Sequence, residues 1–524
     1  MPPTLNETEL DAKLTELEKA RTWTPRVVSK LEALLRSDDD FDLFRMNPLT
    51  FAAERGVDEQ EAIDLFLHGC RGGIFQMNWG IVCPSCGDLL QSFRSLKTLH
   101  NNYTCGMCHI KGTADLDDFI QVSFTVSPLI RNLTAHHPES LSPEAFHFKY
   151  HFAREARGGP GGPRIAEWMQ AAGKLVMFLP PRSTETRTID VTPGFLLGWD
   201  LTRDHGFMFS VDEGATGHAL TVTLADDRYA PENGNLAPGA LTLTFENRME
   251  TRGAMMLANL PPDHFSKKSP VHLDPFLTGR RLIANQTFRD LYRTETIGGQ
   301  EGIGVKDTSL LFTDLKGSTE MYDKIGDLKA FSLVRQHFDR LGKAVFRNAG
   351  AVVKTIGDAV MATFNTPAGA VSAALMMLDE IDAFNKEHGD QALVLKIGVH
   401  HGASIAVTLN DRLDYFGQTV NIAARVQGLA GAEEIYITED VQKAPGVTAL
   451  LARYDVVPQL AALKGVAGQV KVFRITEKGR TPAPAAAKPA PAPAAKAKAK
   501  SAPKSRKAAT KSRRPTPNRK PARR

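Results

Sequence analysis

The sequence predicts a multidomain α+β protein, and three observations support that fold class. A chain of 524 residues is longer than one hydrophobic core usually serves. Strand and helix patterns follow the order βαββαβ between residues 309 and 399, and short alternating segments run from Gly173 to about Phe288. The expected segments are a helical, winged-helix-like unit (1–82), a ribbon with paired cysteines (83–112), a β-rich, sandwich-like domain (113–298), a ferredoxin-like domain (299–476) and a disordered basic tail (477–524).

The composition is that of an ordinary globular protein. Hydrophobic residues make up 42% of the chain and charged residues 23%. No apolar stretch approaches the ~18 to 20 residues that a membrane-spanning helix needs, and the N-terminus is acidic and lacks a hydrophobic signal core. We therefore expect a cytoplasmic protein without a transmembrane segment.

The net charge of +5 averages two unlike parts of the chain. Of the 64 Lys and Arg residues, 16 follow Glu477, which leaves 48 basic against 59 acidic residues in the rest, a net charge of −11. The tail consists mainly of Ala, Pro, Lys and Arg and cannot bury enough apolar area to offset its chain entropy, so it should be disordered. Two interpretations of the tail stay open: a contact with nucleic acid or another polyanion, and a solvated extension.

The first 82 residues predict a compact helical unit. Apolar residues at helical spacing indicate two helices within the first 37 residues. Asn47 before Pro48 is a cap pattern, and Asp58 with Glu61 is a capping-box pattern that opens a further helix. A strand is expected at 74–79. DNA recognition is the weaker interpretation of this unit, because its second capped helix is acidic and phosphate would repel it.

Two C-x-x-C pairs form the next feature. Cys83 and Cys86 are separated from Cys105 and Cys108 by 18 residues. Four thiolates on two tight turns complete a tetrahedral shell, so this spacing predicts a zinc ribbon rather than redox pairs or disulfides. Because four protein ligands leave no open position, the Zn²⁺ should be structural. Cys70 is the odd cysteine, and we expect it to be a buried small hydrophobe.

Residues 113–298 predict mainly β-structure. FIQVSFTV at 119–126 is a strand candidate, and RGGPGGP at 157–163 indicates a flexible connection. Beyond it, the segments LVMFL, TIDVT, ALTVTL and ALTLTFEN are divided by turn residues, a pattern typical of a β-sandwich or small barrel. No convincing catalytic cluster occurs here, so a sensor or regulatory role is expected from position alone.

The C-terminal domain has the clearest pattern. Its expected elements are a strand (309–314), a helix (about 328–348), two strands (351–356 and 359–364), a helix (367–388) and a strand (393–399). A βαββαβ order produces an antiparallel sheet with both helices on one face, which is the ferredoxin-like layout.

Four short motifs lie on this scaffold: LFTDLKGST at 311–319, KTIGD at 354–358, LDYFG at 413–417 and VNIAAR at 420–425. Asp314 ends the first strand, and Asp358 lies in the turn of the neighbouring hairpin. If these strands pair centrally, the two carboxylates meet at one sheet edge and can hold Mg²⁺ ions that carry a triphosphate. Either aspartate alone would more often be a turn or capping residue, so the pair is the informative observation.

On these motifs, residues from about 306 to 476 resemble the catalytic domain of class III adenylate and guanylate cyclases. The resemblance implies a head-to-tail homodimer with two equivalent sites at the interface. One subunit would provide Asp314 and Asp358 for two Mg²⁺ or Mn²⁺ ions. The other would provide the remaining site residues: Lys354, Asp414, Asn421 and Arg425. The implied reaction is attack of the ribose 3′-hydroxyl on the α-phosphate of ATP, which yields 3′,5′-cyclic AMP and pyrophosphate.

The resemblance also assigns a role to each residue of the second group. Adenine offers an acceptor at N1 and a donor at its 6-amino group, which suit Lys354 as donor and Asp414 as acceptor, so ATP is expected over GTP. Asn421 would orient the ribose, and Arg425 would stabilise charge on the α-phosphate. These two residues are four apart in a helix-like stretch and project from one face.

Three other polar residues of this domain carry weaker expectations. Lys464 is a candidate phosphate contact. His400 and His401 are expected to be structural, because alternation along a strand points them apart. No residue is an obvious protein general base.

Three interpretations of the whole chain remain, the third of which is a diguanylate cyclase. In the first, it is an active adenylate cyclase regulated by its N-terminal 300 residues. In the second, a catalytically silent cyclase-like dimer acts as a binding protein through its zinc ribbon and basic tail. The complete set of six site residues favours the first. A diguanylate cyclase is disfavoured because its GG-acid-acid-F signature is absent. The upstream arrangement also resembles an uncharacterised N-terminal region of some bacterial cyclases.

Overall fold

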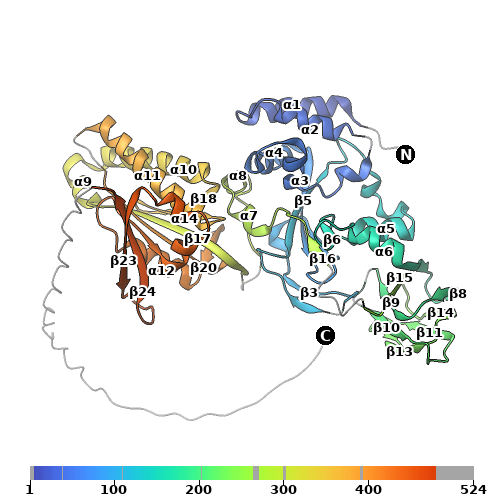
Figure 1. Cartoon of the computed structure of the whole chain (residues 1–524). Coiled ribbons are helices and arrows are strands. Elements are labelled where there is room, and N and C mark those ends of the chain that lie inside the picture. Colours follow the sequence, from blue (N-terminus) through green and yellow to red (C-terminus); the bar gives the residue numbers. More distant parts are fainter. Residues whose placement is uncertain are drawn as a thin grey trace, which may run out of the picture. The chain divides into compact units, whose positions relative to one another are not determined.

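The computed structural model describes residues 5–479 except 38, 109, 202, 204, 264–270, 299–301 and 390–392 (Figure 1). The predicted disordered tail therefore lies outside the described residues from residue 480 onward. Within the described part, no helix is both long and apolar enough to cross a membrane.

Four helices form the N-terminal unit: α1 (Glu7–Ala20), α2 (Val27–Leu35), α3 (Pro48–Arg55) and α4 (Glu59–Gly72). Asn47 caps α3 and Asp58 caps α4, as predicted, by accepting a backbone N–H of the first turn. The expected capping box at α4 is only half formed. Asp58 accepts from the Glu61 N–H at 3.0 Å, whereas the Glu61 carboxylate accepts from the Thr24 N–H at 2.7 Å. Glu61 thus ties the α1–α2 connection to α4 instead of closing the box.

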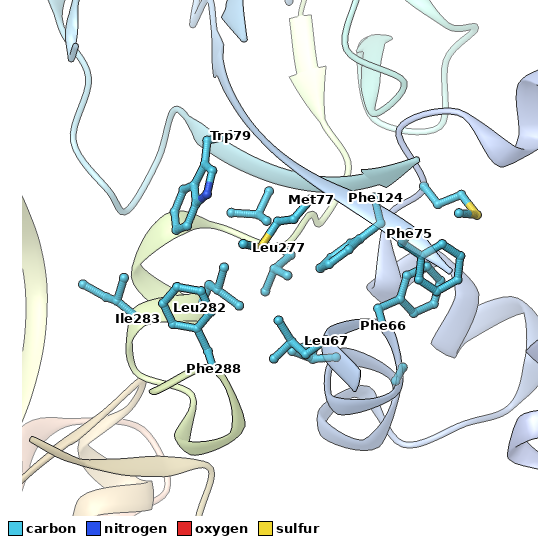
Figure 2. Close-up of a cluster of buried hydrophobic side chains, with 14 of the residues drawn as sticks. Phe66, Leu67, Phe75, Met77, Trp79, Phe124, Leu277, Leu282, Ile283 and Phe288 are labelled. Carbon is cyan, nitrogen blue, oxygen red and sulfur yellow. The ribbon is translucent and has the colours of Figure 1, made fainter. Parts of the chain in front are cut away.

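Helix α4 packs against an antiparallel sheet of order β2-β1-β5, with β1 at Phe75–Val82, β2 at Leu89–Phe93 and β5 at Ile120–Val126. Phe66 of α4 stacks on Phe75 of β1, with ring centroids 4.9 Å apart, and meets Phe124 of β5 edge-on. The same apolar cluster continues to Trp79 and Phe288 (Figure 2). It therefore joins the N-terminal unit to two later helices, α7 (Gly279–Ile283) and α8 (Gln286–Leu291).

Residues 173–260 form two sheets that share one core. One sheet has the strand order β13-β10-β9-β15-β7 and the other β12-β11-β14-β8. Phe207 of the first and Phe245 of the second are buried in the same cluster. The bounds are β7 (Gly173–Leu179), β8 (Thr184–Val191), β9 (Gly194–Asp200), β10 (Gly206–Val211), β11 (Ala219–Leu224), β12 (Tyr229–Ala230), β13 (Asn233–Leu236), β14 (Gly239–Asn247) and β15 (Gly253–Leu260).

The expected β-rich segment 113–298 thus contains several parts in the structure. Strand β5 belongs to the sheet of the N-terminal unit, and all of its residues are buried. Helices α7 and α8 follow the two-sheet part and pack into the N-terminal core. The same segment also contains α5 (Pro143–Tyr150), β6 (Ala156–Gly158), α6 (Ile165–Ala172) and β16 (Val271–Leu273), whereas β3 (Asn102–Thr104) and β4 (Lys111–Thr113) belong to the preceding segment with the paired cysteines.

From residue 303 the chain builds a larger sheet of order β18-β19-β17-β20-β22-β24-β23, with β21 paired to β20. The first four strands of this sheet stand in the chain order 2-3-1-4, which is the ferredoxin-like arrangement. The bounds are β17 (Ile303–Leu315), β18 (Gly350–Ile356), β19 (Ala359–Phe364), β20 (Leu395–Leu409), β21 (Arg412–Phe416), β22 (Ile435–Thr438), β23 (Tyr454–Ala461) and β24 (Val470–Glu477).

Helices α10 (Asp327–Arg347) and α11 (Pro367–His388) contact each other and pack on one face of this sheet (Figure 1). Their bounds agree with the predicted helices within one residue. Alternation along β17 separates two cores, because Leu311 points into the cluster under these helices and Leu310 and Phe312 join the cluster of the N-terminal unit. The shorter helices are α9 (Ser318–Ile325), α12 (Gln418–Gln427), α13 (Glu439–Lys443) and α14 (Val447–Leu450).

Candidate active site

The two predicted metal-binding aspartates lie at one end of the central strands. Asp314 is the penultimate residue of β17, and Asp358 lies in the β18–β19 turn after Gly357, whose φ of +63° favours glycine. Phe312 of β17 pairs with Met361 of β19 in antiparallel register. The same register brings the Asp358 turn alongside the end of β17. A hydrogen bond from the Val360 N–H to Thr313 Oγ1, at 3.0 Å, holds the two segments together.

The surroundings of these carboxylates fit a divalent cation. Asp358 Oδ2 is buried and has no hydrogen-bond partner among the described residues. Asp314 Oδ2 lies 2.6 Å from Lys396 Nζ, and Lys396 is the residue directly opposite Asp314 on β20. A buried, unpaired carboxylate oxygen is unfavourable unless a cation or donor meets it. Carboxylate oxygens are the ligands that Mg²⁺ and Mn²⁺ prefer.

Lys354 and Asp414 come together as a pair. Lys354 Nζ lies 2.5 Å from Asp414 Oδ2, and the second oxygen, Oδ1, accepts the Tyr415 N–H at 2.8 Å. The Lys354 side chain is 38% exposed and that of Asp414 only 8%. An ammonium donor and a carboxylate acceptor therefore stand side by side, with the lysine still accessible from solvent.

Helix α12 carries the other two predicted site residues. Asn421 is exposed and Arg425 is partly buried one turn further along. The Arg425 guanidinium lies beside Gly465, where an added Cβ would be 3.6 Å from its Nη2. Lys464, the weaker phosphate candidate, precedes that glycine and is exposed. In the part of the chain that the structure describes, no hydrogen bond or ion pair links Asn421 or Arg425 to either aspartate.

The four paired cysteines converge on one point. Their sulfur atoms all lie within 4.8 Å of one another, with Cys83 and Cys108 Sγ 3.4 Å apart and Cys86 and Cys105 Sγ 3.6 Å apart. Tetrahedral Zn²⁺ with Zn–S bonds of about 2.3 Å separates its sulfur ligands by about 3.8 Å. Four thiols at this separation fit Zn²⁺.

His400 and His401 each have a hydrogen-bond partner that accounts for a structural role. His400 Nδ1 lies 2.9 Å from Thr438 Oγ1, and burial lowers the pKa of His400 to about 4. His401 Nδ1 lies 3.0 Å from Ser309 Oγ, and burial lowers the pKa of His401 as well. Both rings are therefore neutral near pH 7. Their partners lie on different strands, Thr438 on β22 and Ser309 on β17.

Two features of the site were not expected from the sequence. Lys396 has the charge to neutralise Asp314, but only the register between β17 and β20 places it opposite that residue. Arg289 and Gln286 of α8 reach the strands that carry Asp414 and Lys354. No sequence motif marks these two residues, because they precede the catalytic domain and act through backbone groups.

Comparisons with known proteins find two family matches in this chain. Residues 304–459 match the family described as "Adenylate and Guanylate cyclase catalytic domain", and residues 7–290 match a "Family of unknown function (DUF5939)". The adenylate cyclase of Anabaena cylindrica is 33% identical over 149 residues, 25% of this chain and 30% of the relative. Adenylate cyclase 2 of Rhizobium meliloti (strain 1021) is 28% identical over 153 residues, 27% of this chain and 42% of the relative.

The chain thus spans less than half the length of these two curated relatives. Among solved structures, the adenylyl cyclase CyaB from P. aeruginosa is similar at 20% identity and a TM-score of 0.31. That similarity covers 34% of this chain and 98% of the solved chain.

Proposed function

This chain belongs to the family of unknown function that its residues 7–290 match and carries an adenylate and guanylate cyclase catalytic domain, and from that premise we propose that it converts ATP to 3′,5′-cyclic AMP and pyrophosphate. The observation that carries the proposal is the Lys354–Asp414 pair. Its ammonium donates to adenine N1 and its carboxylate accepts from the 6-amino group. Guanine presents a donor and an acceptor in the opposite order, so the same pair disfavours GTP.

Asp314 and Asp358 would hold two Mg²⁺ or Mn²⁺ ions. When bound, these ions lower the pKa of the ribose 3′-hydroxyl and hold the triphosphate. The chain's own residues prepare that position. The antiparallel register of β17 and β19 brings the Asp358 turn beside the end of β17, and the hydrogen bond from the Val360 N–H to Thr313 Oγ1 joins the two segments. Lys396 neutralises Asp314 as long as no cation is bound there.

Asn421 and Arg425 would act on the ribose and the α-phosphate from a second copy of the chain. No hydrogen bond or ion pair among the described residues joins these α12 residues to the aspartates, as a site shared by two subunits would require. Large apolar side chains next to the site support a dimer too, because Phe416 of β21 is 64% exposed and Ile356 of β18 is 51% exposed. Twofold symmetry would then produce two equivalent sites.

Structural Zn²⁺ on the four cysteines and regulation by the N-terminal region complete the proposal. The zinc ribbon (83–112) would follow a winged-helix-like unit (1–82) that contains α1 to α4 and β1. The apolar cluster that runs from Phe66 through Phe288 to Phe312 supports regulation, because one continuous core contains both the N-terminal helices and a strand of the catalytic sheet.

The test is cyclic nucleotide formation by the purified full-length protein, supplied with ATP or GTP and with Mg²⁺ or Mn²⁺. We expect cyclic AMP from ATP and much less cyclic GMP from GTP. Asp314→Ala is the inactive control. A correctly folded dimer that forms neither product under any of these conditions would contradict the proposal and favour the binding-protein interpretation.

A further inference from the structure

Helix α8 is held firmly by the N-terminal core. The Asn285 carboxamide caps it by accepting the Phe288 N–H at 2.7 Å, and the Asn285 amide donates to Asp64 Oδ1 at 3.2 Å. Phe288 is fully buried and meets Trp79 edge-on, with ring centroids 6.1 Å apart (Figure 2). It also stacks on Tyr292 at 5.4 Å. The position of α8 is therefore determined by residues outside the catalytic domain.

The Arg289 side chain of this helix contacts Leu413 and Tyr415, the residues before and after Asp414 in the sequence. Its Nη1 donates to the Leu413 carbonyl at 2.9 Å, and its guanidinium carbon lies 5.7 Å from the centre of the Tyr415 ring. Its Nε donates to the Ile283 carbonyl at 2.7 Å, at the end of α7. Leu413 and Tyr415 are both buried. One arginine thus contacts the residues on both sides of Asp414, by a hydrogen bond to the Leu413 carbonyl and by a cation–π contact with the Tyr415 ring.

Gln286, one turn earlier on α8, holds the other strand of the pair. Its Oε1 accepts the Val352 N–H at 2.7 Å. Strand β18 is at the edge of the sheet, so outward amides such as this one have no strand partner. The β18–β19 register shifts between Val352 and Lys354, which marks a bulge directly before the lysine. Gln286 therefore holds β18 at Val352, beside the bulge that precedes Lys354.

The two strands that carry the pair are not hydrogen-bonded neighbours. Strand β18 pairs with β19, and β21 pairs with β20. No backbone ladder among the described strands sets the distance between Lys354 and Asp414. Helix α8 contacts both strands through side-chain hydrogen bonds. Helix α8 therefore connects β18 and β21, which do not pair with each other.

We propose that Arg289 and Gln286 are positioning residues that set the spacing of Lys354 and Asp414 and so determine how well the site distinguishes adenine from guanine. This inference rests on the proposed function. It means that part of the base specificity of the catalytic domain is supplied by a helix of the N-terminal region. Neither residue touches the nucleotide, and both act through the backbone of the strands that do.

The test compares variants of the full-length protein: Arg289→Ala, Arg289→Lys, Gln286→Met and the control Arg293→Ala. Arg293 is a matched control because it lines the same cavity of about 270 Å³ between α8 and the strands. Its side chain makes no hydrogen bond or ion pair with any described residue. Each variant is assayed for KM and kcat with ATP and GTP. The affinity for 3′-deoxy-ATP, which lacks the attacking hydroxyl, measures binding without turnover.

For Arg289→Ala we expect KM for ATP and the Kd of 3′-deoxy-ATP to rise about tenfold, with kcat within about twofold of the original. The ATP to GTP ratio of kcat/KM should fall by a similar factor. Gln286→Met should change the same quantities in the same direction. Arg289→Lys should lie between the original and Arg289→Ala, because one ammonium reaches only one of the two carbonyls. Arg293→Ala should match the original protein.

Unchanged KM, Kd and nucleotide ratio in Arg289→Ala and Gln286→Met would overturn the inference. A loss of kcat equal for both nucleotides at constant KM would also overturn it, because that result indicates a merely structural role. If Arg289→Ala does not fold, the KM, Kd and nucleotide ratio of Gln286→Met alone test the inference. An original protein that forms no cyclic nucleotide contradicts the proposed function, whereas the 3′-deoxy-ATP affinities still test the positioning role.

Discussion

Lys396 Nζ lies 2.6 Å from Asp314 Oδ2, directly across the β17–β20 pairing. The Asp314 side chain is 34% exposed and that of Lys396 is 21% exposed, so the pair is accessible to solvent but not freely hydrated. A lysine thus occupies the charge-neutralising position that a divalent cation would take at this carboxylate. The ammonium and the cation should therefore compete for Asp314.

Lys396→Met should strengthen metal binding as a consequence. We expect the Mn²⁺ concentration at half-saturation to fall about threefold to tenfold, because the competing ammonium is removed. Calorimetric titration of the protein with Mn²⁺ measures this directly. Lys343→Met is the control, since Lys343 is exposed on α10. Weaker Mn²⁺ binding by Lys396→Met would show instead that the lysine supports the metal site.

Asp314→Ala should abolish turnover, with cyclic AMP formation reduced by about 10³-fold or more. The dimer should persist, because the exposed apolar residues proposed for the interface are unchanged. Light scattering measures the oligomeric state and a nucleotide assay measures activity. Asp323→Ala, on the exposed side of α9, should retain both properties. Cyclic AMP production by Asp314→Ala at the original rate would contradict the metal-binding role of Asp314.

Lys354→Glu combined with Asp414→Cys should weaken the preference for ATP. The double substitution replaces the donor by an acceptor and removes the carboxylate that accepts from the 6-amino group. We expect the ATP to GTP ratio of kcat/KM to fall by about 100-fold or more. Each single variant serves as a comparison, because it leaves one half of the pair in place. An unchanged ratio in the double variant would refute base reading by these residues.

Cys83→Ser should lose the bound zinc and destabilise the ribbon. We expect about one Zn²⁺ per chain in the original protein by atomic emission or native mass spectrometry. The melting temperature of the variant should be lower, since metal binding stabilises the fold to which its ligands belong. Cys70→Ala is the matched control, because Cys70 is partly buried against the N-terminal core and stands apart from the four paired cysteines. Equal zinc content in Cys83→Ser and the control would exclude this site.

His400 should make the protein less stable in acid. Burial lowers its folded-state pKa to about 4, whereas the unfolded chain binds the proton with a pKa near 6.5. The unfolded state therefore holds more protons between these values, so stability is fully present above about pH 6.5 and is lost as the pH falls toward 4. His400→Gln should flatten the dependence of melting temperature on pH between 6.5 and 4. An identical slope in the variant would refute this assignment.

Local pattern was sufficient for much of the fold. The spacing of apolar residues predicted the bounds of α10 and α11 within one residue, because both helices bury one face on the sheet. The cap residues Asn47 and Asp58 were identified for the same local reason. The hydrogen-bond partner of Glu61 was not identified, because its carboxylate accepts from the Thr24 N–H, which is far away in the sequence. Strand β5 was expected in the β-rich segment but pairs with β1 in the sheet of the N-terminal unit. The partner of a strand depends on residues elsewhere in the chain, so local pattern does not predict it.

The sequence by itself predicted the chemistry that we propose for this protein: two aspartates for metal ions, a lysine and an aspartate for a base, and four thiols for zinc. Motif spacing carries that information, because residue types are local. Only the tertiary structure decided which groups meet. It set Lys396 against Asp314 through β-sheet register, and it brought α8 to two strands that do not pair with each other. Those contacts depend on how separate elements pack, and packing is a property of the whole chain rather than of any segment.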